Sequence, residues 1–524
     1  MGVLTQNLVF YGVVIILFAF FAAFLYMTRK FNYWSKRGVI QTKPIPFFGN
    51  FLDCTLFRKS VSGVVEDLYF EHKSHGHVGF YIYDKPCLLV RDLKLVKRIL
   101  VKDFNSFANR YVSAGEHDPL GSANLFIIKN PHWKTLRTKL SPTMSSGKLK
   151  NMFQLMVNVA DDLDTHLKAL NLEGEGRVVQ FHEVWAQYTT DVIATTAYGL
   201  QANCLNNPAA EFRKYGKKVF EFTYKRAFEF GAIFFVPSLI RPFRLTFFEP
   251  STTEFLRKAF WDTLTHRMKS GIRRNDLIDT LIELKKGQSQ ADLDDPNSFS
   301  KSLIFTPILE FDGDNLTAQA AIYFTGGFET TSSTLSFCLY ELALQPDIQS
   351  KLREEITSAL DENEGELHYE WLPYLGMVVS ETLRKYPIVG ILDRVAINDY
   401  KVPDSDLVIE KGTPIFISAA GFHHDPEYFP EPEKFDPERF NVETKQKIPP
   451  HVYMPFGDGP RNCIGLRFGL LQVKLGLIKI FSKYEITPCD QTLIPMRFEP
   501  KALIPTSEGG LLRVQVSFII PEVH

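Results

Sequence analysis

A long uncharged segment near the N-terminus is the strongest hydrophobic pattern in the chain. The twenty residues from Leu8 to Met27 carry no charge, and the first basic side chains, Arg29 and Lys30, follow them. At a rise of about 1.5 Å per residue, such a helix spans a hydrocarbon core of about 30 Å. A cleaved signal peptide is the alternative, but its basic region would precede a shorter apolar run. We predict a single-pass membrane anchor at residues 1–28, with the rest of the chain in the cytosol.

Behind this anchor, the pattern predicts a stiff linker followed by one large body. Residues 29–50 are basic at first and then contain Pro44 and Pro46. The fixed φ angles and missing N–H donors of these prolines disfavour a helix. Residues 51–524 contain no fixed-period repeat or low-complexity tract at which to divide them. We therefore predict that they form a single domain.

Within the body, helical periodicity dominates and strand-like alternation is confined to short pieces. Apolar residues recur at helical spacing from about Trp133 to Leu360. A hairpin is predicted between His77 and Val90, with its turn at Asp84–Pro86. Further strand-like runs occupy Val395–Ile417 and Ala502–Ile519. The predicted fold is mainly α, with a smaller β-rich portion assembled from both ends of the chain.

The composition excludes several classes of protein. With 59 Lys and Arg against 60 Asp and Glu, the 524-residue chain has a net charge of -1 and no global field that attracts nucleic acid. Its hydrophobic content of 45% and charged content of 23% are those of a globular protein. Six cysteines lie scattered without CxxC spacing, which disfavours a zinc module and a disulfide scaffold. We predict reduced thiols and no nucleic-acid partner.

The most specific chemical pattern is a ten-residue stretch near the C-terminus. Residues Phe456 to Gly465 read FGDGPRNCIG and place Cys463 just before a helical run from Leu466 to Phe481. A helix terminus stabilises a thiolate, although a lone cysteine is more often a buried structural thiol. The stretch matches Phe-x-x-Gly-x-Arg-x-Cys-x-Gly at every fixed position. On this motif the chain resembles the cytochrome P450 family of haem-thiolate monooxygenases.

The resemblance implies a haem b cofactor and a role for each fixed position of the motif. Cys463 would be the axial ligand of the iron. Gly459 and Gly465 would let the backbone approach the porphyrin, and Arg461 would pair with a haem propionate. Phe456, the first fixed position, would belong to the same cofactor site.

Two aromatic and basic positions upstream extend this cofactor site. Trp133 and Arg137 are spaced i,i+4 and share one helical face. A surface arginine beside a half-buried tryptophan is the ordinary interpretation of such a pair. The resemblance implies instead that both bind a propionate, and it implies the same role for Arg110 and Arg394. With Arg461, four cations would then pair with two carboxylates.

A second motif lies in a proline-free helical stretch from Ala318 to Gln345. Gly326 and Gly327 inside it each cost about 1 kcal/mol relative to alanine, which either a tight helix crossing or a functional gap would justify. The resemblance favours the gap, with the glycine pair leaving room for O2. It also implies that Glu329 and Thr330 pass protons to the reacting oxygen.

A third motif is an ion pair on a predicted helix. Glu381 and Arg384 are spaced i,i+3, and most pairs at this spacing are solvated surface pairs. The resemblance implies instead that Arg439 joins them in a buried network. Such a network would brace the loop that carries Cys463.

These motifs predict a monooxygenase of the endoplasmic reticulum membrane. The sequence contains no GxGxxG after a strand and no Walker loop, so electrons from NADPH would arrive through a separate flavoprotein reductase, with cytochrome b5 as a second donor. Three lysines are candidate docking residues: Lys134, Lys474 and Lys479. A haem-thiolate isomerase or dehydratase and a non-catalytic haem sensor are the alternatives, but neither needs the proton relay of Glu329 and Thr330.

The substrate class is inferred from local resemblance and from an aromatic segment. The run Ser141–Phe153 resembles the microsomal group of broad-specificity vertebrate liver enzymes and insect detoxification enzymes. Nine phenylalanines between Phe220 and Pro250 would pack as core or, as we predict, lie at the membrane interface with Phe234 and Phe235 among the acyl chains. A lipophilic substrate would pass from there into a pocket bounded by the loop Tyr111–Ile128 and by five side chains: Phe324, Phe328, Ile388, Leu392 and Ile504.

Overall fold

The computed structural model describes residues 2–294, 311–363, 372–510 and 512–519. The predicted helical region from Trp133 to Leu360 therefore lies partly outside the described residues, as does the C-terminal end of the predicted domain. The contacts group the chain into two compact units. The first unit comprises Met1–Tyr111 and Ile391–Gly421, and the second comprises Val112–Gly390 and Phe422–His524.

The apolar N-terminal segment forms helix α1, Gly2–Thr28. Its residues 6–28 are long and apolar enough to cross a membrane, and none of that stretch is buried. Side chains along the helix, such as Ile16 at 68% and Phe18 at 73%, are exposed. The apolar side chains of α1 therefore do not pack into the protein core, which is what a membrane anchor requires.

A four-stranded sheet organises the first unit, with strand order β1-β2-β7-β4. Strands β1, His77–Ile82, and β2, Lys85–Val90, form the predicted antiparallel hairpin. Strand β7, Pro414–Ser418, pairs in parallel with β2 and antiparallel with β4, Ile391–Val395. The β-rich portion is therefore assembled from segments far apart in the chain, as predicted.

The hairpin turn lies one residue earlier than predicted. Tyr83, with a φ of 54°, and Asp84 form the turn, while Lys85 and Pro86 already belong to β2. A proline is tolerated there because β7 pairs with β2 only at Leu88 and Leu89, so its missing N–H interrupts no ladder bond.

The remaining elements of the first unit are short. They are α2 (Leu52–Thr55), α3 (Val61–Glu71), α4 (Leu93–Lys97) and the two-stranded sheet of β5 (Tyr400–Lys401) and β6 (Val408–Ile409).

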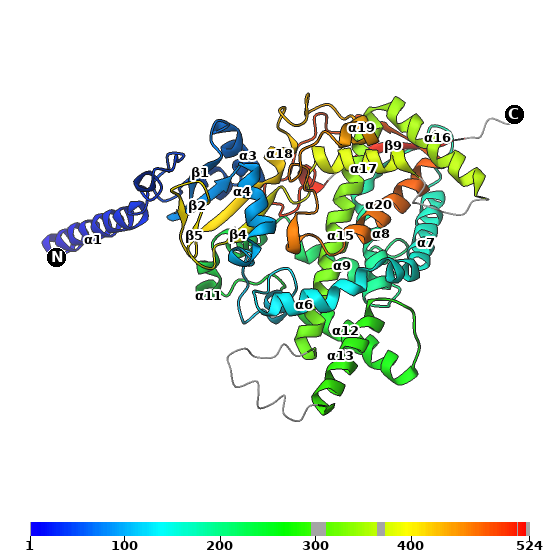
Figure 1. Cartoon of the computed structure of the whole chain (residues 1–524), viewed down its shortest axis with the longest axis horizontal. Coiled ribbons are helices and arrows are strands. Elements are labelled where there is room, and N and C mark those ends of the chain that lie inside the picture. Colours follow the sequence, from blue (N-terminus) through cyan, green and yellow to red (C-terminus); the bar gives the residue numbers. More distant parts are fainter. Residues whose placement is uncertain (1, 295–310, 364–371, 511, 520–524) are drawn as a thin grey trace. The chain divides into compact units, whose positions relative to one another are not determined.

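Helix α15, Gly313–Leu344, is the longest helix of the second unit. It contacts α8 (Phe181–Ala197), α17 (Pro373–Lys385) and α20 (Leu466–Phe481) (Figure 1). α15 begins before the predicted Ala318 because the Asp312 side chain accepts a hydrogen bond from the Gly313 N–H at 2.7 Å. α20 has the predicted bounds.

Further helices of the second unit are α5 (Pro119–Ala123), α6 (His132–Leu140), α7 (Ser146–Ala169), α9 (Glu211–Val219), α10 (Tyr224–Phe235), α11 (Ile240–Phe243), α12 (Pro250–Ser270), α13 (Leu277–Asp294), α16 (Pro346–Glu362) and α19 (Val442–Lys445). Helix α18 (Ala419–His423) spans the boundary of the units.

The second unit also contains a three-stranded sheet that sequence patterns predicted only in part. β9, Arg513–Phe518, pairs antiparallel with both β3, Arg177–Gln180, and β8, Tyr484–Pro488. The predicted run from Ala502 to Ile519 contains β9, whereas β3 and β8 were not predicted. Strands of four or five residues are too short to show an alternating pattern.

Candidate functional site

The loop carrying Cys463 has a defined backbone structure. Gly457 and Gly459 have φ angles of 71° and 70°, which glycine adopts without strain. The Asp458 side chain accepts a hydrogen bond from the Gly459 N–H at 2.6 Å, and the Cys463 N–H donates to the Phe456 carbonyl at 2.8 Å. These bonds leave Cys463 exposed directly before α20. An exposed thiol at a helix start can bind a metal of a cofactor as a thiolate.

Two predicted cofactor residues on α6, Trp133 and Arg137, contact this loop, to which Arg461 belongs. The Arg137 guanidinium donates to the Asn462 carbonyl at 2.9 Å and to its side-chain oxygen at 2.7 Å. Arg461 donates to the Ile128 carbonyl at 3.0 Å, and its guanidinium lies 4.3 Å from the centre of the Trp133 ring. The structure therefore brings these residues together, with Arg137 holding the residue next to Cys463. Their pairing with propionates stays a prediction.

Arg110 and Arg394 both contact Asp393 in the first unit. Arg110 lies 3.4 Å from the Asp393 side chain, and Arg394, 2% exposed, donates to the Asp393 carbonyl at 2.7 Å. Asn109 also bridges to Val395 at the end of β4. Of the four arginines predicted to bind propionates, Arg110 and Arg394 thus lie in the first unit and Arg137 and Arg461 in the second.

Helix α15 is buried except for one stripe. Ile322, Tyr323, Gly326, Gly327 and Thr330 are its unburied positions between Leu316 and Ala343, and they recur at helical spacing. A Cβ added to Gly326 would meet no described atom within 4 Å. The stripe therefore has room for a ligand beside Gly326.

The two adjacent glycines of α15 serve different purposes. A Cβ on Gly327 would lie 2.2 Å from Ile193 Cδ1 on α8, so this glycine permits a close helix crossing. Gly326 is exposed and faces open space. Gly327 therefore fits the alternative of a tight helix crossing, whereas a gap for O2 at Gly326 stays a prediction.

Glu329 and Thr330 have different surroundings. The Thr330 hydroxyl donates to the Gly326 carbonyl at 2.6 Å on the accessible stripe. Glu329 is 5% exposed, and its carboxylate lies 3.9 Å from His182 Nε2 on α8. Burial raises the pKa of Glu329 to about 7, against the opposing effect of Arg213. A carboxyl group with this pKa can take up and release a proton near neutral pH.

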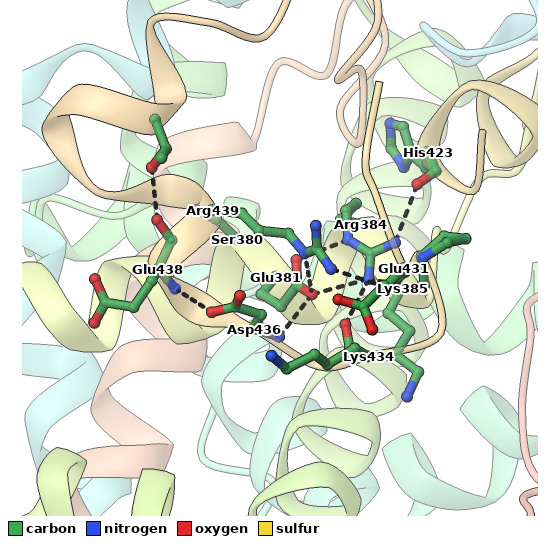
Figure 2. A network of polar contacts seen from close by, with 12 residues as sticks. Ser380, Glu381, Arg384, Lys385, His423, Glu431, Lys434, Asp436, Glu438 and Arg439 are labelled. Carbon is green, nitrogen blue, oxygen red and sulfur yellow. Dashed lines mark hydrogen bonds and ion pairs between the residues drawn. The ribbon is translucent and has the colours of Figure 1, made fainter. Parts of the chain in front are cut away.

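Glu381, Arg384 and Arg439 form a connected network in the second unit (Figure 2). Arg384 makes two hydrogen bonds to the Glu381 carboxylate, at 2.7 and 2.8 Å, and both side chains are 0% exposed. Arg439 Nε lies 3.4 Å from Glu381 Oε1. The spacing alone is typical of a surface pair, but the packing has removed this pair from solvent completely.

The network connects toward the cysteine loop through a residue that sequence patterns did not indicate. Arg384 donates to the His423 carbonyl at 3.1 Å (Figure 2). The His423 ring accepts a hydrogen bond from the Met454 N–H at 2.8 Å. Burial lowers the pKa of His423 to about 3, so the ring is neutral and can accept this bond. Met454 lies two residues before Phe456. His423 carries no local motif that could have revealed this role.

The predicted pocket residues are closely packed. Phe324 and Phe328 are both 0% exposed, and their ring centroids lie 5.2 Å apart in a tilted arrangement. They belong to an aromatic cluster with Phe212 and Phe220. Each ring would have to move to contact a substrate. Of the others, Ile388 and, in the first unit, Leu392 are buried, and Ile504 is half-buried. Their contact with substrate stays a prediction.

Taken within the second unit, the residues fit a haem. An exposed cysteine, the open space at Gly326 and at Gly465, and the two cations Arg137 and Arg461 match a flat dianionic group that is bound through a thiolate. The described side chains contain no cluster of three His, Cys, Asp or Glu that could hold a separate metal ion.

Comparison with known proteins gives one consistent result. The family model described as Cytochrome P450 matches residues 40–513 in a single stretch that includes most of each unit, which confirms the predicted fold class of one large domain. The predicted domain bounds of 51–524 stay a prediction. "Cytochrome P450 6k1" of Blattella germanica is 46% identical over 495 residues, or 94% of either chain. "Probable cytochrome P450 6g2" of Drosophila melanogaster is 41% identical and covers 93% of this chain and 95% of its own. Both relatives are insect proteins, which confirms the predicted resemblance to the insect group.

Proposed function

The chain belongs to the cytochrome P450 family, and on that premise we propose that it inserts one atom of O2 into lipophilic small molecules, including foreign compounds, at the endoplasmic reticulum membrane. The family assignment makes it a haem-thiolate monooxygenase. The observation that carries the proposal is Cys463, which is exposed at the end of its loop directly before α20.

The haem would be held by residues already placed. Cys463 would bind the iron, and Arg137, Arg461 and Trp133 would bind the propionates, with Arg110 and Arg394 adding further cations. When bound, the haem supplies the activation of O2. The chain itself orients the group, keeps the Gly326 side of α15 open for the substrate, and carries protons through Glu329 and Thr330.

Turnover with labelled oxygen tests this function. Enzyme reconstituted with reductase, NADPH and a diverse lipophilic panel should give products that carry one atom from isotopically labelled O2. Rearranged products formed without NADPH would instead indicate an isomerase. Substrate binding without any turnover would indicate a sensor.

Thr330→Ala should uncouple NADPH consumption from product formation. The hydroxyl lies on the accessible stripe, so its loss impairs proton delivery and leaves haem and substrate binding intact. Product per NADPH should fall several-fold while hydrogen peroxide rises. Thr334→Ala is the matched control, because the Thr334 hydroxyl makes the same type of bond, 2.8 Å to the Thr330 carbonyl, at a buried position of the same helix. Full coupling in Thr330→Ala would contradict the assigned role.

A second membrane contact is proposed at the Phe-rich segment. Prolines divide it into α10, α11 and the start of α12, as the sequence predicted. Phe228 is 46% exposed and Phe243 is 62% exposed, and their ring centroids lie 6.2 Å apart. Arg241, two residues before Phe243, is also exposed. Phe234 is half-buried against Phe126 and Phe230. Phe228 and Phe243 are therefore more exposed than the predicted Phe234 and Phe235 and are the better candidates for contact with a bilayer.

Removal of residues 1–28 should leave measurable binding to phospholipid vesicles. Phe228→Ser with Phe243→Ser should then reduce vesicle binding, because two exposed rings are lost without disturbance of the core. Val442→Ser, at a residue 80% exposed on α19, is the control for loss of apolar surface elsewhere. If the truncated protein does not sediment with vesicles, the second contact does not exist.

The redox partner is proposed to be a membrane-bound flavoprotein reductase, with cytochrome b5 as an additional donor. Lys134 is exposed on α6 and is available for docking. Lys479 forms an ion pair of 2.6 Å with Asp161 and is 17% exposed, and Lys474 is half-buried. Of the three predicted docking lysines, Lys134 is therefore the strongest candidate.

A further inference from the structure

A buried histidine on α8 faces the proton-carrying carboxyl group of α15. His182 is 9% exposed, and its Nε2 has no hydrogen-bond partner among the described residues. That nitrogen lies 3.9 Å from Glu329 Oε1. A buried polar atom without a partner is destabilising, so packing alone does not account for its position. At this distance one bridging water or a small side-chain shift completes a proton path.

An ion pair between α8 and α9 lies next to His182 in the chain and is partly exposed. Arg213 on α9 makes two hydrogen bonds to the Glu183 carboxylate, at 2.9 and 2.8 Å, and the two side chains are 6% and 40% exposed. Glu183 follows His182 directly in α8. Arg213 and, on the same helix, Lys217 disfavour a cation on His182, whereas Glu183 favours it. His182 therefore has a half-exposed carboxylate as its neighbour in the chain and a buried carboxylate 3.9 Å from its Nε2.

The pKa values of His182 and Glu329 favour proton transfer from the histidine to the carboxylate. Burial lowers the pKa of His182 to about 4 and raises the pKa of Glu329 to about 7. At neutral pH the imidazole is neutral and Glu329 is partly protonated. A proton that arrives on His182 is therefore more stable on Glu329.

We propose that His182 delivers protons from the α8–α9 surface to Glu329. The imidazole accepts one proton from solvent at Nδ1 and releases one from Nε2 to the Glu329 carboxylate. One proton moves inward and no electron is transferred. Glu329 returns to its starting state when it passes the proton on toward Thr330, and a flip of the imidazole ring then exchanges the two nitrogens and resets His182. His182 acts through Glu329 and does not touch the substrate. Only this last transfer rests on the proposed monooxygenase function.

The first test needs no turnover and follows the Glu329 carboxyl group by infrared spectroscopy. Its protonated C=O band, identified by its absence in Glu329→Gln, should be strong at pH 6 and weak at pH 8, since the raised pKa keeps the group protonated to near neutrality. After mixing with D2O, this band should shift at least about tenfold more slowly in His182→Gln than in the native protein. His166→Gln, which changes a half-buried histidine of α7, should exchange at the native rate. Equal rates in His182→Gln and the native protein would overturn the proposal.

The second test separates a relay from a packing role. Free imidazole should restore fast exchange in His182→Ala, which leaves space for it, and should not affect His182→Gln. Should either variant take up haem poorly, the other still tests the proposal. During turnover, His182→Gln should divert NADPH to hydrogen peroxide as Thr330→Ala does. If His182→Gln couples NADPH consumption to product as the native protein does while Thr330→Ala is uncoupled, the role of His182 is rejected and the proposed function is kept. If the native protein shows no turnover, the proposed function is rejected and the exchange test still decides the role of His182.

Discussion

Cys463→His should abolish oxygen insertion while leaving part of the protein able to take up haem. The structure places Cys463 exposed at the start of α20, next to Asn462, which Arg137 holds by two hydrogen bonds. An imidazole can bind iron at this position, but it lacks the electron donation of a thiolate. The reduced carbon-monoxide complex should therefore lose its strongly red-shifted absorption band, and product formation should fall below detection.

Cys54→Ser is the matched control for loss of a thiol. Burial raises the pKa of Cys54 to about 12, so this half-buried thiol is not a thiolate at neutral pH and cannot serve as the ligand. The variant should keep the native spectrum and the native activity. A native spectrum in Cys463→His would eliminate the central assignment.

Arg384→Ala should be the most destabilising single change at the network that supports the loop. It leaves the Glu381 carboxylate, 0% exposed, without its bidentate partner. Breaking such a buried pair costs about 3–5 kcal/mol, because the remaining charge stays buried. Denaturant unfolding should show this loss, and haem content should fall because the connection through His423 to Met454 is weakened.

The control for this prediction is a surface pair on neighbouring elements. Lys351 and Glu438 lie 2.7 Å apart, with side chains 57% and 47% exposed. Lys351→Ala should change the stability by only about 0–1 kcal/mol, since solvent screens the pair. Similar losses in Arg384→Ala and Lys351→Ala would show that the buried network contributes no special stability.

Much of the fold follows from local sequence patterns. The apolar run, the helix after Cys463 and the β1–β2 hairpin have a periodicity or a turn signal within a few residues, and each is found close to its predicted place. Such patterns reflect the 3.6-residue and two-residue periods of helix and strand. Short strands such as β3 do not extend far enough to show a period, and only pairing with β9 defines them.

The same distinction between local sequence pattern and tertiary packing applies to the candidate functional site. Its motif residues were identified from the sequence, since fixed spacings near Cys463, Glu329 and Glu381 resemble those of a known family. What each residue contacts was decided by tertiary packing. Arg137 binds Asn462, 325 residues away, and Gly327 packs against Ile193 while its neighbour Gly326 stays open. His182 approaches Glu329 only because α8 crosses α15 at that point. These contacts join residues from distant segments, and no local pattern encodes a pairing between segments that packing alone brings together.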